Sequence, residues 1–310
     1  MPNWSDVLNE IQREIATNNA AARRAVDTVR RNYLRQLFEY TKRNVIAYYS
    51  GFLSKPDIEG IEITDEDKNG FMMGVHRLDR SRGLDLIVHT PGGSIAATES
   101  LVDYLHSMFD DDIRVIVPQI AMSGGTMIAC SSREIIMGKH SNLGPIDPQV
   151  RGIPALGVIE EFLRARREIA KDSGRAQLWY PILSQYRPTF LSQCENAVAW
   201  SNDFVGQQLR EVMFRGDPKA DVTAKAIVRA LSGYRRNRTH NRHLHIADCQ
   251  KLGLRVSALE SDPILQDLVL TVHHCFMHSL TNTPAFKMIE NHLGVAFVKQ
   301  QAAMMAQGAG

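Results

Sequence analysis

The chain has 310 residues, of which 44% are hydrophobic and 23% are charged, and its formal net charge is +2. This composition predicts an ordinary globular protein with one large domain, or one domain with appendages. The near-zero net charge argues against nucleic acid as a partner and against an enzyme for strongly acidic substrates.

The spacing of the cysteines and the length of the apolar runs indicate in which cellular compartment the protein is expected. No apolar run reaches the length of a membrane span, and the polar, acidic N-terminus is unlike a signal peptide. The cysteines lie far apart without CxxC spacing, at Cys130, Cys194, Cys249 and Cys275. Neither a zinc site nor a disulfide framework is therefore predicted, and a reducing cytoplasm fits best. We expect a cytoplasmic protein with no cofactor, no bound metal and no membrane partner.

The first part of the chain predicts helices and one strand. Apolar residues recur at helical spacing over residues 4–42. We interpret the arginine-rich second half as the solvated face of a helix that packs against the body or another subunit. This amphipathic extension, residues 1–43, precedes the main domain. Residues 45–52 predict the first core strand. Residues 65–78 predict a helix with Thr64 as its N-cap and acidic residues in its first turn.

Three short apolar runs occupy the central stretch of the chain. Residues 84–88, 113–117 and 134–137 have the length and composition of strands. The first two runs each end in a glycine pair and continue into a helical pattern, which for the first pair covers residues 95–109. Strands that alternate with helices in this order predict an α/β fold with a parallel sheet and crossover helices.

The two glycine pairs are the strongest candidates for chemistry. A strand that breaks at glycines and starts a helix leaves free backbone N–H groups, and glycine lets the backbone approach a ligand closely. Two such turns side by side would form an oxyanion hole, with donors at Gly92 or Gly93 and at Gly124. Ser123 stands next to that point, and we predict that it is a nucleophile for acyl transfer. The competing serine, Ser94, is explained as a helix N-cap.

The later part of the chain is predicted to be mainly helical. The pattern predicts first a charged helix, then a helical region broken near Pro188, and then a helix capped by Asp-Pro. After these come a short extended piece with a helix that ends at Gly253, and a last long helix. These elements cover residues 152–170, 179–214, 219–231, 237–254 and 262–279. We therefore expect a helical C-terminal region over residues 257–310.

Three motifs together resemble the Clp-fold serine peptidases. HTPGG, AMSGGT and LGPIDPQ occur in this order and at compatible spacing, and the resemblance covers residues 45–256. The superfamily includes the Clp protease proteolytic subunit and signal peptide peptidase A, and this sequence is most similar to the serine dehydrogenase proteinase (SDH) family. The resemblance implies a Clp/crotonase-like fold over residues 44–256. It also implies a serine peptidase that acts on peptide or protein substrates as a homo-oligomer.

The resemblance leaves the general base open. In the Clp proteolytic subunit a histidine ends the strand after the nucleophile helix, but Ile146 or Asp147 stands there in this sequence. His140 lies several residues too early. The same comparison places the acidic member of the triad near Asn241, with His240 beside it. In signal peptide peptidase A the base is a lysine on a later helix.

Three arrangements therefore compete: Ser123–His240–Asp147, Ser123–Lys171, and a degraded site. A histidine oriented by a carboxylate is a good base at neutral pH. Lys171, the nearest analogue of the lysine, is followed by Asp172 at an exposed helix end, which keeps an amine protonated. We therefore favour His240 with Asp147. The missing strand-end histidine also supports a second hypothesis, a catalytically silent or partner-regulated scaffold or effector with the Clp fold.

Overall fold

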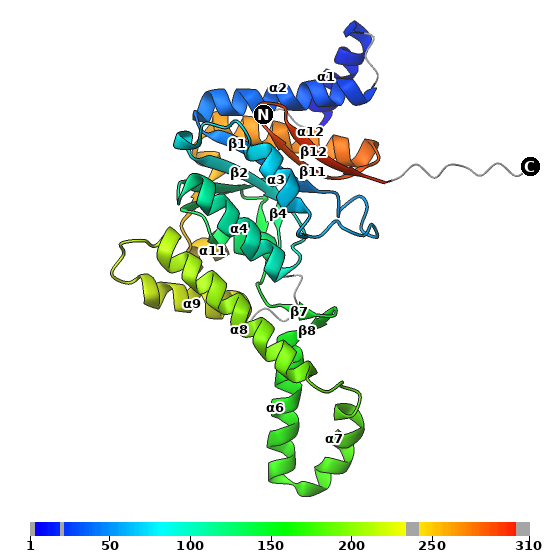
Figure 1. The fold of residues 1–310 in the computed structure, drawn as a ribbon, viewed down its shortest axis with the longest axis vertical. Helices are drawn as coiled ribbons and strands as arrows, with labels where there is room; N and C mark the ends of the chain where they lie inside the picture. Colours follow the sequence, from blue (N-terminus) through cyan, green and yellow to red (C-terminus); the bar gives the residue numbers. More distant parts are fainter. Residues whose placement is uncertain (1–3, 19–21, 234–241, 302–310) are drawn as a thin grey trace, which may run out of the picture.

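A computed structural model describes residues 4–18, 22–233 and 242–301 of the chain. Its centre is a seven-stranded sheet with the order β10-β5-β3-β2-β1-β11-β12 (Figure 1). The parallel strands are β1 (Asn44–Ser50), β2 (Leu84–His89), β3 (Ile113–Val117), β5 (Glu134–Met137) and β10 (Val256–Ala258). The predicted parallel sheet with crossover helices is confirmed.

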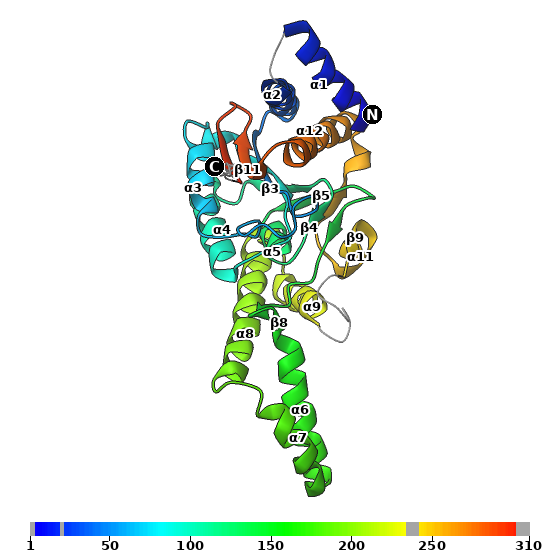
Figure 2. The ribbon, with the colours of Figure 1, turned by 90° about the vertical axis from the view of Figure 1, so that its right-hand side faces the viewer.

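Helices cover both faces of this sheet, and its central strands are therefore buried on both sides. In β1, Ile46 and Tyr48 face one layer, whereas Ala47 and Tyr49 face the other. Figure 2 shows α3 and α4 on one side of the sheet and α2 and α12 on the other. The helices named here are α2 (Ala22–Thr41), α3 (Asp67–Val75), α4 (Ile95–Phe109) and α12 (Pro263–Asn282), and α5 (Gly124–Cys130) follows the second glycine turn.

The N-terminal extension packs against the body of the molecule, one of the two predicted arrangements, but one of its arginines is buried. α1 (Trp4–Asn18) and α2 lie against α12. Arg30 was expected on a solvated face, but it is only 1% exposed, and its Nε donates to Glu290 at 2.5 Å. This part of the prediction is wrong, because a buried carboxylate compensates the charge of the arginine.

The C-terminal region is not only helical, which corrects the prediction for residues 257–310. α12 begins as predicted, with the Asp262 side chain accepting a hydrogen bond from Leu265 N. Two antiparallel strands then complete the central sheet, β11 (Ala285–Asn291) beside β1, and β12 (Ala296–Gln300) beside β11. The sequence conceals β11 because this fully buried strand carries Lys287 and Glu290, whose partners come from distant elements.

The start of α3 also differs from the prediction. Thr64 was expected as its N-cap, but α3 begins at Asp67 after Glu66, which makes no side-chain capping bond. Instead, the Asp67 carboxylate accepts a hydrogen bond from Thr64 N at 3.0 Å. Asp67 therefore fixes the loop that precedes α3. Thr64 donates its N–H to this carboxylate and does not cap the helix.

An arm of helices projects from the body of the molecule (Figures 1 and 2). It is formed by α6 (Ala155–Lys171), α7 (Ala176–Leu183) and the first part of α8 (Phe190–Gln208). The predicted helical break near Pro188 lies between α7 and α8. The remaining elements are β4 (Ile120–Ala121), β6 (Asn142–Leu143), β7 (Gln149–Val150), β8 (Ile153–Pro154), α9 (Ala220–Ser232), β9 (Leu244–His245) and α11 (Ile246–Leu252).

No helix within the described ranges is long and apolar enough to cross a bilayer. All four cysteines are buried free thiols. The division into an extension, a main domain and a C-terminal region stays a prediction, although β11 and β12 belong to the same sheet as β1.

Candidate active site

Two glycine turns meet at the carboxyl ends of β2 and β3. They are tied together by Met122 N, which donates to the backbone oxygen of Thr90 at 3.0 Å. A methyl group added to Gly92 would lie 2.6 Å from Cβ of Ser123 and 2.9 Å from Gly124 N. The first turn therefore lies directly against the second, and only glycine fits at position 92.

Ser123 has a backbone conformation that residues with side chains rarely adopt, with φ 50° and ψ −113°. It directly precedes α5, and its carbonyl accepts a hydrogen bond from Met127 N at 3.0 Å. Strain of this kind costs about 1–3 kcal/mol and is concentrated at functional sites. A sharp strand-to-helix turn also exposes the nucleophilic serine of many hydrolases. The conformation therefore makes Ser123 the leading candidate for a reactive group.

The glycine N–H groups are not equivalent. Gly92 N donates to the hydroxyl oxygen of Thr90 at 3.2 Å, so this group is engaged. In the described part of the chain, the N–H groups of Gly93 and Gly124 have no hydrogen-bond partner. A methyl group on Gly124 would lie 3.4 Å from Gly93 N, which places the two free donors close together. Of the three predicted donors, the N–H groups of Gly93 and Gly124 are therefore the two that could bind an oxyanion. Gly92 is needed because its lack of a side chain lets the two turns come together.

Ser94 is the N-cap of α4, as predicted, and its hydroxyl oxygen accepts a hydrogen bond from Ala97 N at 3.2 Å. We expect Ser94→Ala to lower the free energy of unfolding by about 1 kcal/mol, because one N–H at the helix start loses its partner. Urea denaturation measures this loss. Ser107→Ala, on the exposed side of the same helix, is the control and should stay within about 0.5 kcal/mol of wild type.

The third motif packs against the second. The Thr126 hydroxyl bonds to both backbone groups of Gly144, with 3.0 Å to its oxygen and 3.0 Å to its nitrogen. Ile146 is then fixed twice, since its oxygen accepts from the Ser201 hydroxyl at 2.9 Å and its nitrogen donates to Leu231 O at 3.2 Å. The LGPIDPQ loop therefore has a defined position beside Ser123.

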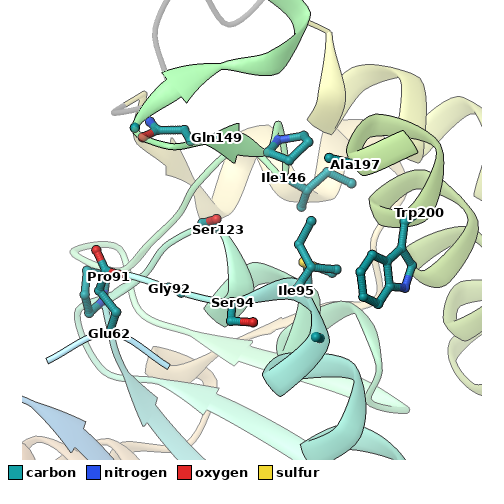
Figure 3. A pocket seen from close by; sticks show the side chains of 15 residues that line it. Glu62, Pro91, Gly92, Ser94, Ile95, Ser123, Ile146, Gln149, Ala197 and Trp200 are labelled. Carbon is teal, nitrogen blue, oxygen red and sulfur yellow. The ribbon is translucent and has the colours of Figure 1, made fainter. Parts of the chain in front are cut away.

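A pocket of about 530 Å³ opens over Ser123. Figure 3 shows Ser123 and the first glycine turn between an apolar wall and a polar edge. Ile95, Ile146, Ala197 and Trp200 form the wall, with Met127 nearby, and Glu62, Pro91 and Gln149 lie toward the edge. The indole of Trp200 is held by a hydrogen bond from Nε1 to Glu99 at 2.8 Å. The volume is typical of a site for a small molecule or a short chain segment.

Of the residues predicted as base or orienting carboxylate, those that the structure describes do not line this pocket. Asp147 lies between two lining residues, and its side chain is 3% exposed and has a partner. Lys171 is exposed at the far end of α6, on the projecting arm. His140 is exposed and also lies outside the lining. His240 lies outside the described residues. Among the described lining residues, Glu62 alone carries an ionisable side chain.

Several other histidines among the described residues have structural partners or lie in the core. His278 bonds through Nε2 to Trp4 O at 3.1 Å, and His273 contacts the Tyr49 hydroxyl at 3.3 Å. Burial lowers the pKa of His89 to about 3, so this side chain is neutral. His89 packs against Tyr49 and Phe52, away from the pocket. In the described ranges, no group of three acidic, histidine or cysteine side chains is placed to hold a metal ion.

The parallel sheet, its crossover helices and its paired glycine turns define an α/β protein of the Clp fold. The chain belongs to the family of ClpP-like SDH-type serine proteinases, whose pattern matches residues 15–271. The resemblance predicted from the three motifs is therefore confirmed at the level of the family.

Two curated relatives come from Methanocaldococcus jannaschii. The uncharacterized protein MJ1495 is 31% identical over 195 residues, which cover 63% of this chain and 59% of that protein. The uncharacterized protein MJ0137 is 29% identical over 194 residues, covering 63% of this chain and 60% of that protein. The chain thus matches about three fifths of the length of these relatives.

Two residues beside the site were missed from the sequence. Thr90 precedes the first glycine pair within HTPGG, and its place between strand and turn could have suggested a role for its hydroxyl. Ile63 forms a parallel bridge with Gly93, but it belongs to an irregular loop that is distant from Gly93 in the sequence. No local pattern identifies it, because its role depends on which segment lies beside the turn.

Proposed function

We propose that this protein is a serine peptidase in which Ser123 attacks the carbonyl carbon of a peptide bond. The observation that carries the proposal is that Ser123 lines a pocket beside the N–H groups of Gly93 and Gly124, which have no partner among the described residues. These groups stabilise the negative charge that develops on the carbonyl oxygen.

The reaction follows from this arrangement. The Ser123 Oγ–carbon bond forms while a base removes the hydroxyl proton, and the tetrahedral oxyanion accepts hydrogen bonds from the two glycines. The carbon–nitrogen bond then breaks, the proton passes to the leaving amine, and water hydrolyses the acyl-enzyme. We propose His240 with Asp147 as base and orienting carboxylate, with Lys171 as the alternative. In support of this, the end of α9 lies next to the residue before Asp147, since Leu231 O accepts a hydrogen bond from Ile146 N.

The proposed substrates are peptide or protein segments. The apolar wall formed by Ile95, Ile146 and Trp200 favours a segment that presents an apolar side chain next to the scissile bond. We also propose that the protein acts as a homo-oligomer. In support of this, α7 exposes Leu178 and Tyr180, at 70% and 77%, on the projecting arm.

A fluorophosphonate probe tests the proposed nucleophile. The expected result is a covalent adduct on Ser123: the Oγ–phosphorus bond forms, the phosphorus–fluorine bond breaks, and the fluoride and the hydroxyl proton leave. Intact-mass measurement and peptide mapping locate the adduct. Heat-unfolded protein is the control and should not react. If folded wild-type protein carries no adduct on Ser123, the peptidase proposal is wrong.

The second candidate function is a catalytically silent or partner-regulated scaffold. It is favoured by the described pocket lining, which includes neither histidine nor lysine. The same probe separates the two functions, because a silent scaffold leaves Ser123 unmodified. A partner-regulated enzyme would react only after the partner is added.

A further inference from the structure

A buried ion pair is connected by hydrogen bonds to the first glycine turn. Lys287 on β11 donates through Nζ to both carboxylate oxygens of Asp67, each at 2.9 Å. The two side chains are 0% and 1% exposed. Burial lowers the pKa of Lys287, and the charge of Asp67 opposes this effect. Because such a pair adds little stability compared with apolar residues of equal volume, its presence calls for another role.

The ion pair holds both ends of one short loop segment. Lys287 Nζ donates to the backbone oxygen of Glu62 at 2.5 Å. Asp67 accepts a hydrogen bond from Thr64 N at 3.0 Å. The intervening residue, Ile63, is thus fixed on both sides by charged groups that water does not reach.

Ile63 in turn fixes the glycine turn. Its N–H donates to Gly92 O at 2.7 Å, and its oxygen accepts from Ser94 N at 3.0 Å. Gly93, between these two contacts, forms a parallel bridge with Ile63 and comes so close that a methyl group on it would lie 2.3 Å from Ile63 N. Since both sides of Gly93 are bonded to Ile63, its own N–H points away from this loop.

A second connection runs through Tyr48. Its hydroxyl donates to Asp67 Oδ2 at 2.9 Å and also interacts with the Thr90 hydroxyl. Thr90 Oγ1 accepts the N–H of Gly92 at 3.2 Å. Burial and the charge of Asp67 raise the pKa of Tyr48 well above its ordinary value, so the phenol stays neutral and keeps its donor. The ion pair therefore reaches the turn by two separate routes.

We propose that Lys287, Asp67 and Tyr48 are positioning residues that hold the first glycine turn so that the Gly93 N–H points toward Ser123. None of the three lines the pocket, so they act through Ile63 and Thr90. The inference rests on the proposed function, in which the Gly93 N–H is an oxyanion donor. It assigns a role to a polar cluster that four separate elements bring together: β1, α3, the end of β2 and β11.

Three variants test the proposal. Tyr48→Phe removes one hydroxyl without changing the packing volume, and Lys287→Met removes the ammonium group and keeps an apolar stem. The matched control is Tyr49→Phe, which removes a buried hydroxyl from the same strand on the opposite face, where it contacts His273. If Lys287→Met does not fold, Tyr48→Phe alone decides.

The first measurement is amide hydrogen exchange, which needs no activity. We expect faster exchange at the N–H groups of Ile63, Gly92 and Ser94 in Tyr48→Phe and Lys287→Met, and wild-type rates at these amides in Tyr49→Phe. The second is the kinetics of Ser123 phosphonylation by a fluorophosphonate probe. We expect the maximal rate to fall about tenfold in Tyr48→Phe and about 10²-fold in Lys287→Met, with the concentration for half-maximal rate unchanged.

The outcomes separate this inference from the proposed function. Exchange at these amides that matches Tyr49→Phe overturns the inference, and so does faster exchange with an unchanged phosphonylation rate. If wild-type Ser123 never reacts but exchange still rises in Tyr48→Phe, the proposed function fails while the positioning of the turn is supported.

Discussion

Ser123→Ala is expected to reduce peptide hydrolysis by about 10⁴- to 10⁶-fold, because without the hydroxyl no acyl-enzyme forms and the oxyanion donors have no attacking group to assist. The free energy of unfolding should change by less than about 1 kcal/mol, since the half-buried hydroxyl leaves no cavity. Release of fluorescence from heavily labelled casein measures the first quantity, and urea denaturation measures the second.

The matched control is Ser107→Ala, which removes an exposed hydroxyl that donates to Tyr104 O at 2.7 Å. It should hydrolyse casein at the wild-type rate. A Ser123→Ala protein that keeps the wild-type rate would show that another group, or a contaminating enzyme, cleaves the substrate. Ser94→Ala distinguishes the two serines of the pocket, since it should keep the Ser123 adduct and lose only stability.

The parallel core of this fold could be predicted from the sequence because it is built from local patterns. The strands at residues 113–117 and 134–137 are apolar runs of strand length, and both have the predicted bounds in the structure. β11 could not be found in this way. Its buried Lys287 and Glu290 are neutralised by Asp67 and Arg30, and no window along the chain contains both members of either pair.

The candidate site also has parts that local motifs predict and parts that depend on residues distant in the sequence. The glycine pairs and Ser123 form continuous motifs, so their meeting at one place could be expected from strand order alone. Which N–H groups stay free could not, because Thr90 engages Gly92, and Ile63 sets the direction of the Gly93 peptide. The base remains a prediction, since His240 lies outside the described residues and Lys171 lies on the arm.

Gly93→Ala should be the most damaging change outside Ser123, because the added methyl group meets backbone rather than a movable side chain. It would lie 2.3 Å from Ile63 N and 2.4 Å from Ile63 O, so the bridge between the two segments must open. We expect hydrolysis to fall by about 10²–10³-fold, the cost of losing one oxyanion donor. Stability should fall by about 1–3 kcal/mol, as in other overpacked sites.

Gly216→Ala is the control that separates the steric clash at Gly93 from the backbone strain that alanine causes at a glycine position. Gly216 has φ +79° and no atom within 4 Å of an added methyl group, so alanine there meets backbone strain alone. It should lower stability by about 1 kcal/mol and leave hydrolysis unchanged. If Gly93→Ala hydrolyses casein within about twofold of Gly216→Ala, the Gly93 N–H is not an oxyanion donor. Since Gly92 N is engaged by Thr90, the first turn would then supply no donor at all, and the stabilising groups would have to lie on the Gly124 side of Ser123.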